Sequence, residues 1–326
     1  MAELRWHPLI KDWVMIASHR QNRPQMPENW CPFCPSSGNV PDYEVMKYDN
    51  DFPALMQNPP KPDDVANNFF KAEPAYGKCE VILYSPKHTI TLPQLPESHV
   101  RKLVDLWIER FEDIKKDEKI KYVYIFENRG EVVGVTMPHP HGQIYGYSFI
   151  PKKLKLELEA CREYYDKAGE CLICRMLFEE RDFKERIIFE NEDFTVFLPF
   201  FTEYPYGVYI INRNHKQNLT QFNEREKNNL AKTIRQTVGM LDSLFDKPFP
   251  YMMCMHQDPV NSGDFSDEYH FHIEFFSPMR TEVKQKFNAS SETGAWAHCN
   301  PTAPEEKATE LRAAYKKFID NDLKPI

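Results

Sequence analysis

Met137-Pro138-His139-Pro140-His141-Gly142-Gln143-Ile144 closes the first of two similar series of motifs in this chain. Each series begins with Cys-x-x-Cys, at Cys31–Cys34 and Cys171–Cys174, and each ends with His-x-His, at His139–His141 and His270–His272. Between these motifs, both series carry an apolar run that ends in a histidine, then a helical pattern and a second apolar run. Because all these features recur in the same order, we interpret the chain as two related α+β halves.

The segments between the motifs indicate the elements of each half. The run Val81–His88 aligns with Val208–His215, and Tyr122–Phe126 aligns with Tyr251–Met255; all four runs are typical of strands. Apolar residues at helical spacing predict one long helix in each half and a third near the C-terminus. They are Leu103, Leu106, Trp107, Phe111 and Ile114 in the first half, Leu230, Ile234, Val238, Leu241 and Phe245 in the second, and Leu311, Tyr315 and Phe318 after Pro304.

The division between the halves is expected in a charged stretch. Pro151 is followed by Lys152–Glu159, in which charged residues alternate with apolar ones. We therefore predict an N-terminal half over residues 1–155 and a C-terminal half over residues 156–326. Each is expected to hold a mainly antiparallel sheet packed with helices.

Composition limits the class of protein. Of the 326 residues, 41% are hydrophobic and 28% are charged, as in soluble globular proteins, and the net charge of −8 argues against nonspecific binding to nucleic acid. No apolar stretch approaches the length of a membrane span, and the N-terminal residues lack the pattern of a signal peptide. We expect a cytoplasmic protein whose eight cysteines are reduced, so that their spacing carries the information.

The cysteine pairs predict zinc. A Cys-x-x-Cys turn supplies two thiolates, and tetrahedral zinc takes four soft or borderline ligands, so two histidines of the same half would complete each set. The first predicted site consists of Cys31, Cys34, His88 and His139. By the repeat, the second consists of Cys171, Cys174, His215 and His270. The other cysteines fit no pattern and are expected to be small buried residues: Cys79, Cys161, Cys254 and Cys299.

The segment around His141 carries the features of a nucleophile. On an extended backbone, His139, His141 and Gln143 would point to the same side. Pro140 would stiffen this platform, and Gly142 would let a ligand approach the backbone. If His139 binds zinc, His141 remains to attack an activated phosphorus. An imidazole with a pKa of about 6.5 is a good nucleophile at neutral pH. Gln143 could donate hydrogen bonds to the phosphoryl oxygens as their charge builds.

The segment His139-Pro140-His141-Gly142-Gln143 resembles the signature of the histidine-triad superfamily, and within it the galactose-1-phosphate uridylyltransferase branch. The resemblance covers nearly the whole chain and implies two tandem histidine-triad-like halves. Hydrolases of the superfamily carry a third histidine where this sequence has Gln143. The resemblance implies that His141 takes a uridylyl group from UDP-glucose, releasing glucose 1-phosphate, and passes it to galactose 1-phosphate to form UDP-galactose.

Further positions agree with the family pattern and are assigned by resemblance only. Those expected to contact the phosphates, the sugar or the uridine are Arg20, Arg23, Asn50, Asp51, Asn128 and Thr136, where Thr136 stands in place of the usual serine. A C-terminal sugar-binding group is expected to serve the site of a partner subunit, which implies a homodimer; it consists of Lys286, Phe287 and Glu292.

Several alternatives stay open at this level. Some family members hold a second metal with one glutamate and three histidines, which here would be Glu157, His256, His270 and His272; His270 cannot serve both this set and the cysteine set. A related sugar-nucleotide phosphorylase or adenylyltransferase would use the same histidine with another base or acceptor. A histidine-triad hydrolase is disfavoured by Gln143. A zinc protein without enzymatic activity is disfavoured by the wide separation of the ligands and the acidic balance.

Overall fold

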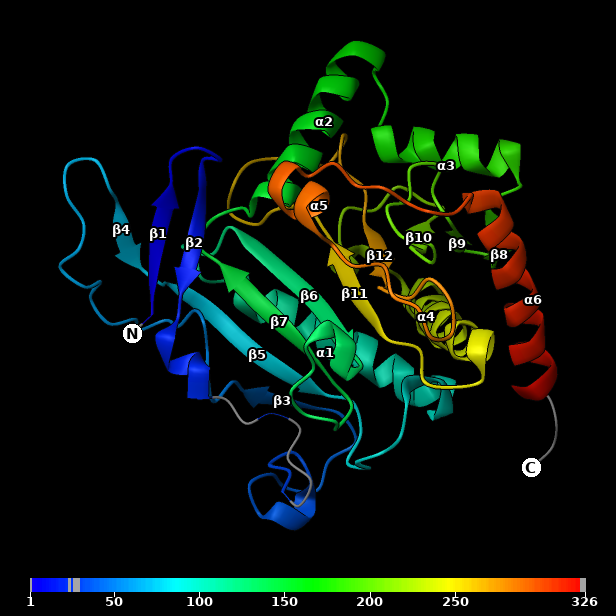
Figure 1. Cartoon of the computed structure of the whole chain (residues 1–326), viewed down its shortest axis with the longest axis horizontal. Coiled ribbons are helices and arrows are strands. Elements are labelled where there is room, and N and C mark those ends of the chain that lie inside the picture. Colours follow the sequence, from blue (N-terminus) through cyan, green and yellow to red (C-terminus); the bar gives the residue numbers. More distant parts are fainter. Residues whose placement is uncertain (1, 23–24, 26–29, 323–326) are drawn as a thin grey trace.

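The computed structural model describes residues 2–22, 25 and 30–322, and its centre is one sheet of nine strands (Figure 1). Every neighbouring pair of strands runs antiparallel. In spatial order the strands are β3 (Met46–Asp49), β5 (Gly77–Leu83), β7 (His141–Tyr147), β6 (Tyr122–Arg129), β11 (Tyr251–His256), β12 (His272–Phe276), β10 (Tyr209–Asn212), β9 (Phe194–Phe197) and β8 (Ile187–Glu190). The prediction of an α+β fold with mainly antiparallel sheet is confirmed.

The order of the strands displays the repeat. The first half contributes β5, β7 and β6, and the second contributes β11, β12 and β10, which is the same series in reverse. The halves join where β6 pairs with β11, with Phe126 opposite Cys254. The predicted halves are therefore not separate bodies joined by a linker, because they share one continuous sheet.

The register corrects the sequence alignment of the two halves. Leu83 of β5 lies opposite His141, and Ile211 of β10 lies opposite His272. Leu83 therefore corresponds to Ile211, whereas the alignment by their following histidines pairs it with Ile210. The reason is that the turn between the strand and the histidine is one residue shorter in the second half.

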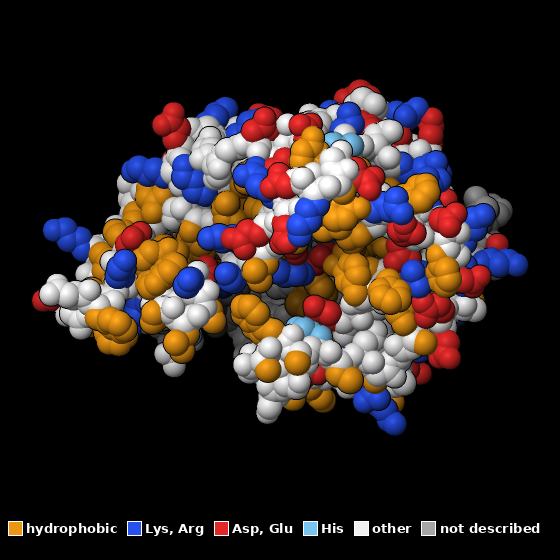
Figure 2. All heavy atoms as spheres, turned by 90° about the horizontal axis from the view of Figure 1, so that it is seen from above, with side chains coloured by type: hydrophobic (Ala, Val, Ile, Leu, Met, Phe, Trp, Pro, Cys, Tyr) orange, Lys and Arg blue, Asp and Glu red, His pale blue; other side chains and the backbone are white. Residues whose placement is uncertain are grey.

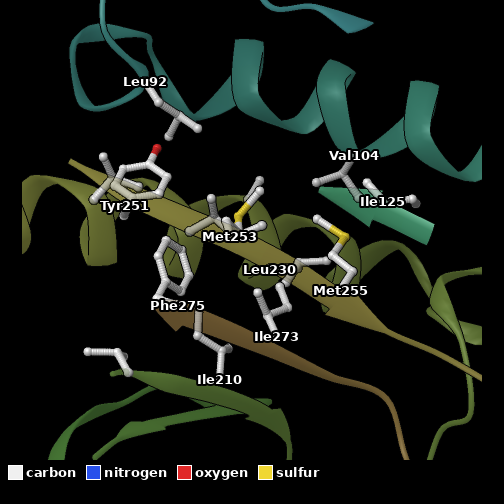
Figure 3. Packing of buried hydrophobic residues seen from close by; sticks show 14 of the residues in the cluster. Leu92, Val104, Ile125, Ile210, Leu230, Tyr251, Met253, Met255, Ile273 and Phe275 are labelled. Carbon is white, nitrogen blue, oxygen red and sulfur yellow. The ribbon is translucent and has the colours of Figure 1, made fainter. Parts of the chain in front are cut away.

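Helices α1 (Glu97–Ile114) and α4 (Glu224–Phe245) pack on one face of the sheet, behind it in Figure 1. Helix α6 (Pro304–Asp322) packs on α4 and on β8, so all three predicted helices are confirmed. Figure 3 shows the resulting core, in which Met253 and Met255 of β11 lie among side chains of α1, α4 and β12. Alternate residues of these strands face the helices and leave the others to the opposite face.

Two further helices, α2 (Lys152–Ala168) and α3 (Leu172–Phe183), cover the opposite face of the second half. The charged stretch after Pro151 is thus the first part of a helix, and the expected division at residues 155 and 156 falls inside it. Leu154, Leu158 and Cys161 recur on its buried side, a helical period that the surrounding charges obscure.

The first half carries a small sheet of β2 (Asp12–Ile16), β1 (Glu3–His7) and β4 (Ala72–Pro74). A short helix, α5 (Ser290–Ala295), follows β12. In the described part of the chain, no helix is long and apolar enough to cross a membrane. Figure 2 shows acidic and basic side chains intermingled over one face, without a large area of a single sign.

The cysteines outside the two pairs follow the expectation with one exception. Cys79, Cys161 and Cys254 are buried, as predicted for small apolar side chains. Cys299 is exposed instead, because it lies in the segment between α5 and α6 and not in an element of the core.

Candidate active site and metal centres

The first predicted zinc ligands come together from three separate parts of the chain. Cys31 and Cys34 lie at the turn before a short 3-10 helix, Pro35–Ser37, and His88 follows the end of β5. Nδ1 of His88 lies 3.3 Å from Sγ of Cys34, and Nδ1 of His139 lies 3.6 Å from Sγ of both cysteines. All four ligand atoms lie within 4.8 Å of one another.

The other ring nitrogen of His139 is held from outside the cluster. Nε2 of His139 lies 2.7 Å from the carbonyl oxygen of Ser85, which fixes Nε2 as the protonated nitrogen and leaves Nδ1 for a metal. The hydroxyl of Tyr43 lies 3.0 Å from the same nitrogen and donates to the Ser85 carbonyl at 2.9 Å. Burial lowers the pKa of His139 to about 4, so this imidazole is neutral, as a ligand must be.

The second cysteine set repeats this geometry. Sγ of Cys174 lies 3.2 Å from Nδ1 of His215 and 3.2 Å from Nδ1 of His270, and Cys171 completes the group within the same 4.8 Å limit. Nε2 of His215 lies 2.8 Å from the carbonyl oxygen of Ser266. In the first cluster, Nε2 of His139 lies 2.7 Å from the carbonyl oxygen of Ser85. The same ring nitrogen therefore faces the sulfur atoms in both halves.

The distances in both clusters suit tetrahedral zinc. With Zn–S of about 2.3 Å and Zn–N of about 2.0–2.1 Å, a tetrahedron places sulfur and nitrogen roughly 3.6 Å apart. The sulfur–nitrogen distances of 3.3–3.6 Å in the first cluster match this edge, and those of 3.2 Å in the second are slightly shorter. The donor atoms, their number and their spacing therefore fit the ion.

The alternative metal set does not assemble as four ligands. Glu157, His256 and His272 form a group of three, in which Nδ1 of His256 lies 2.8 Å from Oε2 of Glu157. His270 directs Nδ1 to Cys174 instead, and its Nε2 is buried without a hydrogen-bond partner. The cysteine set and the glutamate set are therefore neighbouring groups, and His270 belongs to the first by distance.

His141 is the first residue of β7, beside the first metal cluster. Its Nδ1 lies 2.7 Å from the carbonyl oxygen of His139. A carbonyl only accepts hydrogen bonds, so Nδ1 carries the proton and Nε2 presents a lone pair. The ring of Phe33, which lies between Cys31 and Cys34 in the sequence, packs 5.6 Å from the His141 ring. The Cys31–Cys34 turn of the candidate metal cluster therefore also packs against the candidate nucleophile, through Phe33.

A pocket at His141 brings together five of the predicted site residues. Asn50, Asp51, Thr136, His141 and Gln143 all line it, together with aromatic side chains that the sequence did not single out: Trp30, Phe33, Tyr48 and Phe52. Asp51 accepts a hydrogen bond from Tyr48 at 3.1 Å. Asn128 lines the adjoining pocket, which also reaches His141. Segments far apart in sequence thus meet around one imidazole.

Gln143 is held by a residue that the sequence analysis missed. The hydroxyl of Tyr145 donates to Oε1 of Gln143 at 3.2 Å and accepts a hydrogen bond from Arg20 at 3.2 Å. Because Oε1 is engaged, the amide nitrogen of Gln143 is the part left to donate to a ligand. Tyr145 lies two residues beyond Gln143 on the same strand, so the strand period could have revealed it.

The shared platform of His139, His141 and Gln143 stays a prediction. His139 lies in a bend before β7, with its Nδ1 toward the cysteine cluster. His141 and Gln143 belong to β7 itself and line the pocket. The ring of Phe33 packs against both histidine rings, so the two imidazoles lie close to one another.

The remaining predicted residues lie elsewhere. Lys286, Phe287 and Glu292 do not line the pocket at His141: Lys286 is buried and lies 3.3 Å from Glu292, and Phe287 is exposed. Arg23 falls outside the described residues.

Comparisons with known proteins agree with one another. Family models for galactose-1-phosphate uridyl transferase match residues 1–151 with the N-terminal domain and residues 157–313 with the C-terminal domain. Galactose-1-phosphate uridylyltransferase of Thermotoga maritima is 40% identical over 314 residues, which cover 96% of this chain and 98% of the relative. The same enzyme of Haemophilus influenzae is 31% identical and covers 95% of this chain and 93% of its own.

Solved structures give the same picture. The structure of a uridylyltransferase mutant superposes with a TM-score of 0.89 at 31% identity, covering 99% of this chain and all of that one. An ADP-glucose phosphorylase from Arabidopsis thaliana, solved with bound ADP-glucose, has a TM-score of 0.74 at 21% identity over 96% of this chain and 99% of its own. This second likeness concerns the fold alone.

Proposed function

The chain belongs to the galactose-1-phosphate uridylyltransferase family and is a nucleotidyltransferase, and from this premise we propose that it transfers the uridylyl group through a covalent bond to His141. Uridylyl transfer is the activity of the family. The finer proposal is that UDP-glucose is the donor and galactose 1-phosphate the acceptor. The observation that carries the covalent step is the Nδ1 contact of His141 with the His139 carbonyl, which leaves Nε2 with its lone pair.

The proposed reaction has two displacements. Nε2 of His141 attacks the phosphorus that carries the uridine, a P–N bond forms, and the P–O bond to the departing glucose 1-phosphate breaks. A phosphate oxygen of galactose 1-phosphate then attacks the same phosphorus and breaks the P–N bond, which gives UDP-galactose and free His141. Splitting one transfer into two steps lowers each barrier, as in other covalent mechanisms.

The pocket residues supply the other roles. Gln143, oriented by Tyr145, donates its amide N–H to a phosphoryl oxygen as negative charge grows there. Asn128 is proposed to reach the phosphates from the adjoining pocket, and Asp51 to accept hydrogen bonds from the ribose. The aromatic side chains of the pocket offer faces for the uracil ring.

We assign zinc to both cysteine-containing sets, because their distances fit its tetrahedron and thiolates hold zinc tightly. The first ion would fasten the Cys31–Cys34 turn and His139 to the pocket, and so fix the position of the His141 ring. The ion would supply rigidity, and the chemistry on phosphorus belongs to His141.

We also propose that the protein works as a homodimer. Phe287 is 73% exposed and stands with Lys286 and Glu292 outside the pocket of their own chain. A partner subunit would give this exposed ring a protected surface, and the family pattern assigns the same stretch to the partner's sugar site. Sedimentation at micromolar concentration gives the oligomeric state, and the transfer rate is measured at the same concentration. A monomer that transfers at full rate would contradict the proposal.

The decisive experiment is mass spectrometry of the intact protein after brief exposure to UDP-glucose without acceptor. We expect an adduct of one uridylyl group that maps to His141, survives base, is lost in acid and is discharged by galactose 1-phosphate. An adduct formed only from ADP-glucose would favour the adenylyltransferase alternative. Steady release of UMP without acceptor would favour a hydrolase, and the absence of any adduct would exclude the covalent mechanism.

A further inference from the structure

The hydroxyl group of Tyr48 binds the carboxylate that is proposed to contact the ribose. It donates to Asp51 and lies 3.1 Å from Oδ2 and 3.2 Å from Oδ1 of that residue. Within the described part of the chain, no other side chain hydrogen-bonds to this carboxylate. The orientation of the Asp51 side chain therefore depends on one hydroxyl group.

The backbone of the loop that carries Asp51 is fixed by other contacts. Oδ1 of Asn50 accepts a hydrogen bond from the backbone N–H of Phe52 at 2.9 Å. Nε2 of His19 lies 3.0 Å from the carbonyl oxygen of Pro53. Neither contact involves the carboxylate, and Asp51 is exposed. Without the tyrosine hydroxyl, this side chain would be able to change its rotamer.

The ring of Tyr48 is held by packing. Tyr48 belongs to β3, at the edge of the nine-stranded sheet, and lies opposite Val81 of β5. Phe33 packs edge-on against the Tyr48 ring, with the ring centroids 5.3 Å apart. The Phe33 ring also lies 5.6 Å from the ring of His141. A ring supported in this way presents its hydroxyl group in a fixed direction. One packed group therefore connects the carboxylate of Asp51 with the proposed nucleophile.

The register places Tyr48 and Gln143 in one row across the sheet. Tyr48 lies opposite Val81, and Val81 lies opposite Gln143. Opposite residues point to the same side of a sheet, so these two side chains face one pocket from strands about 10 Å apart. Both line the pocket at His141. The ribose and the phosphoryl group of a nucleotide would thus meet polar side chains from different strands.

Tyr48 keeps its proton at neutral pH. Burial, and then the negative charge of Asp51, raise the pKa of Tyr48 to about 12, so its hydroxyl group remains a donor. A carboxylate offers about four acceptor sites, and one O–H group fills one of them. Asp51 can therefore accept hydrogen bonds from a ligand while Tyr48 holds it.

We infer that Tyr48 is a positioning residue, which holds the Asp51 carboxylate toward the ribose and makes the site prefer a ribonucleotide to a 2′-deoxyribonucleotide. The inference rests on the proposed function, in which Asp51 accepts hydrogen bonds from the ribose. A carboxylate held in place loses a partner when the 2′-hydroxyl group is missing. A carboxylate that can rotate would turn to the remaining hydroxyl group or to water, and would distinguish the two sugars less.

The test is calorimetric binding of UMP and 2′-deoxy-UMP to the zinc-loaded wild type and to Tyr48→Phe, which keeps the ring and loses only the hydroxyl group. We expect the wild type to bind UMP about tenfold more tightly, the effect of one hydrogen bond to a charged group. In Tyr48→Phe, this preference should fall to about threefold or less, because UMP binds more weakly.

The transfer reaction gives a second readout. With UDP-glucose and galactose 1-phosphate, Tyr48→Phe should raise KM for UDP-glucose and leave kcat within about twofold, because the hydroxyl group does not touch the reacting atoms. In an Asp51→Asn background, Tyr48→Phe should cause no further loss of the ribose preference, since Tyr48 acts through the carboxylate.

The matched control is Tyr164→Phe. The hydroxyl group of Tyr164 donates to Oε1 of Glu170 at 3.0 Å, and neither residue lines the pocket. This variant therefore removes a contact between a tyrosine and a carboxylate elsewhere on the chain. It should keep the ribose preference and the KM of the wild type.

The inference is overturned if the wild type does not distinguish UMP from 2′-deoxy-UMP, if it binds neither, or if Tyr48→Phe keeps the full preference. A fall in kcat with KM unchanged would also overturn it. So would an undiminished effect of Tyr48→Phe in the Asp51→Asn background, which would indicate direct contact with the nucleotide. Failure of the covalent mechanism is recognised separately, by the absence of the His141 adduct, because binding of UMP requires neither the adduct nor the acceptor.

Discussion

Nδ1 of His141 lies 2.7 Å from the carbonyl oxygen of His139, and this hydrogen bond joins a candidate metal ligand to the proposed nucleophile. The ring of His139 is turned into the cysteine cluster, while its backbone carbonyl fixes the tautomer of His141. One residue therefore connects the cysteine cluster to the histidine at the start of β7.

His141→Gly is expected to abolish uridylyl transfer and to leave a cavity where the ring was. Free imidazole diffusing into it should restore part of the transfer, because the pocket for the nucleotide is otherwise intact. The measurement is the rate of UDP-galactose formation with increasing imidazole, with zinc content as the check on folding. Full activity of the variant without imidazole would contradict the covalent mechanism.

Cys31→Ser should lose about one zinc per chain and lower the stability of the first half, because structural zinc contributes folding energy directly. Cys174→Ser should lose the other ion. Cys299→Ser provides the matched control, since Cys299 is exposed and outside both clusters. Metal analysis and thermal unfolding measure the effect, and unchanged zinc in Cys31→Ser would show that the first site is assigned wrongly.

Tyr145→Phe should lower kcat by roughly tenfold, less than the factor of about 10²–10³ that loss of a whole transition-state donor costs. The hydroxyl of Tyr145 holds Oε1 of Gln143 at 3.2 Å, so its removal frees the amide to rotate without removing it. Steady-state kinetics measure the change. Tyr147→Phe is the control, two residues further along β7, and an equal loss there would point to a general disturbance of the strand.

Glu127 makes the stability dependent on pH. Burial raises the pKa of this fully buried carboxyl from 4.5 to about 7, although Tyr251 donates to it at 2.8 Å. The unfolded chain therefore releases the proton at lower pH than the native one, and the free energy of unfolding falls as pH rises from 4.5 to about 7. The expected loss is about 3 kcal/mol, and it is complete above that range.

Glu127→Gln removes the ionisation and should flatten this part of the curve. Because the amide stays neutral, the variant should be more stable than the wild type at pH 8 relative to pH 5. Chemical denaturation at both values measures the difference. If the free energy of unfolding changed equally with pH in the variant and the wild type, the pKa of Glu127 would not be raised in the native state.

The sequence by itself determined the parts whose signal is local. Cys-x-x-Cys and His-x-His are short motifs, and their repetition predicted both clusters of metal ligands that the structure assembles. The helices containing Trp107 and Ile234 follow from apolar spacing, because the side that faces the sheet must be apolar. The resemblance to the galactose-1-phosphate uridylyltransferase family was likewise carried by a few adjacent residues around His141.

Other features depend on which distant segments meet, and only the tertiary structure decided them. In the sequence, His270 could belong either to the metal set of Glu157 or to that of the cysteines. Packing placed its Nδ1 against Cys174. Tyr145 reaches Arg20 only because β7 and the N-terminal segment lie together. Local patterns fix residue type and period, but contacts across the chain are selected by the free energy of the whole packed sheet.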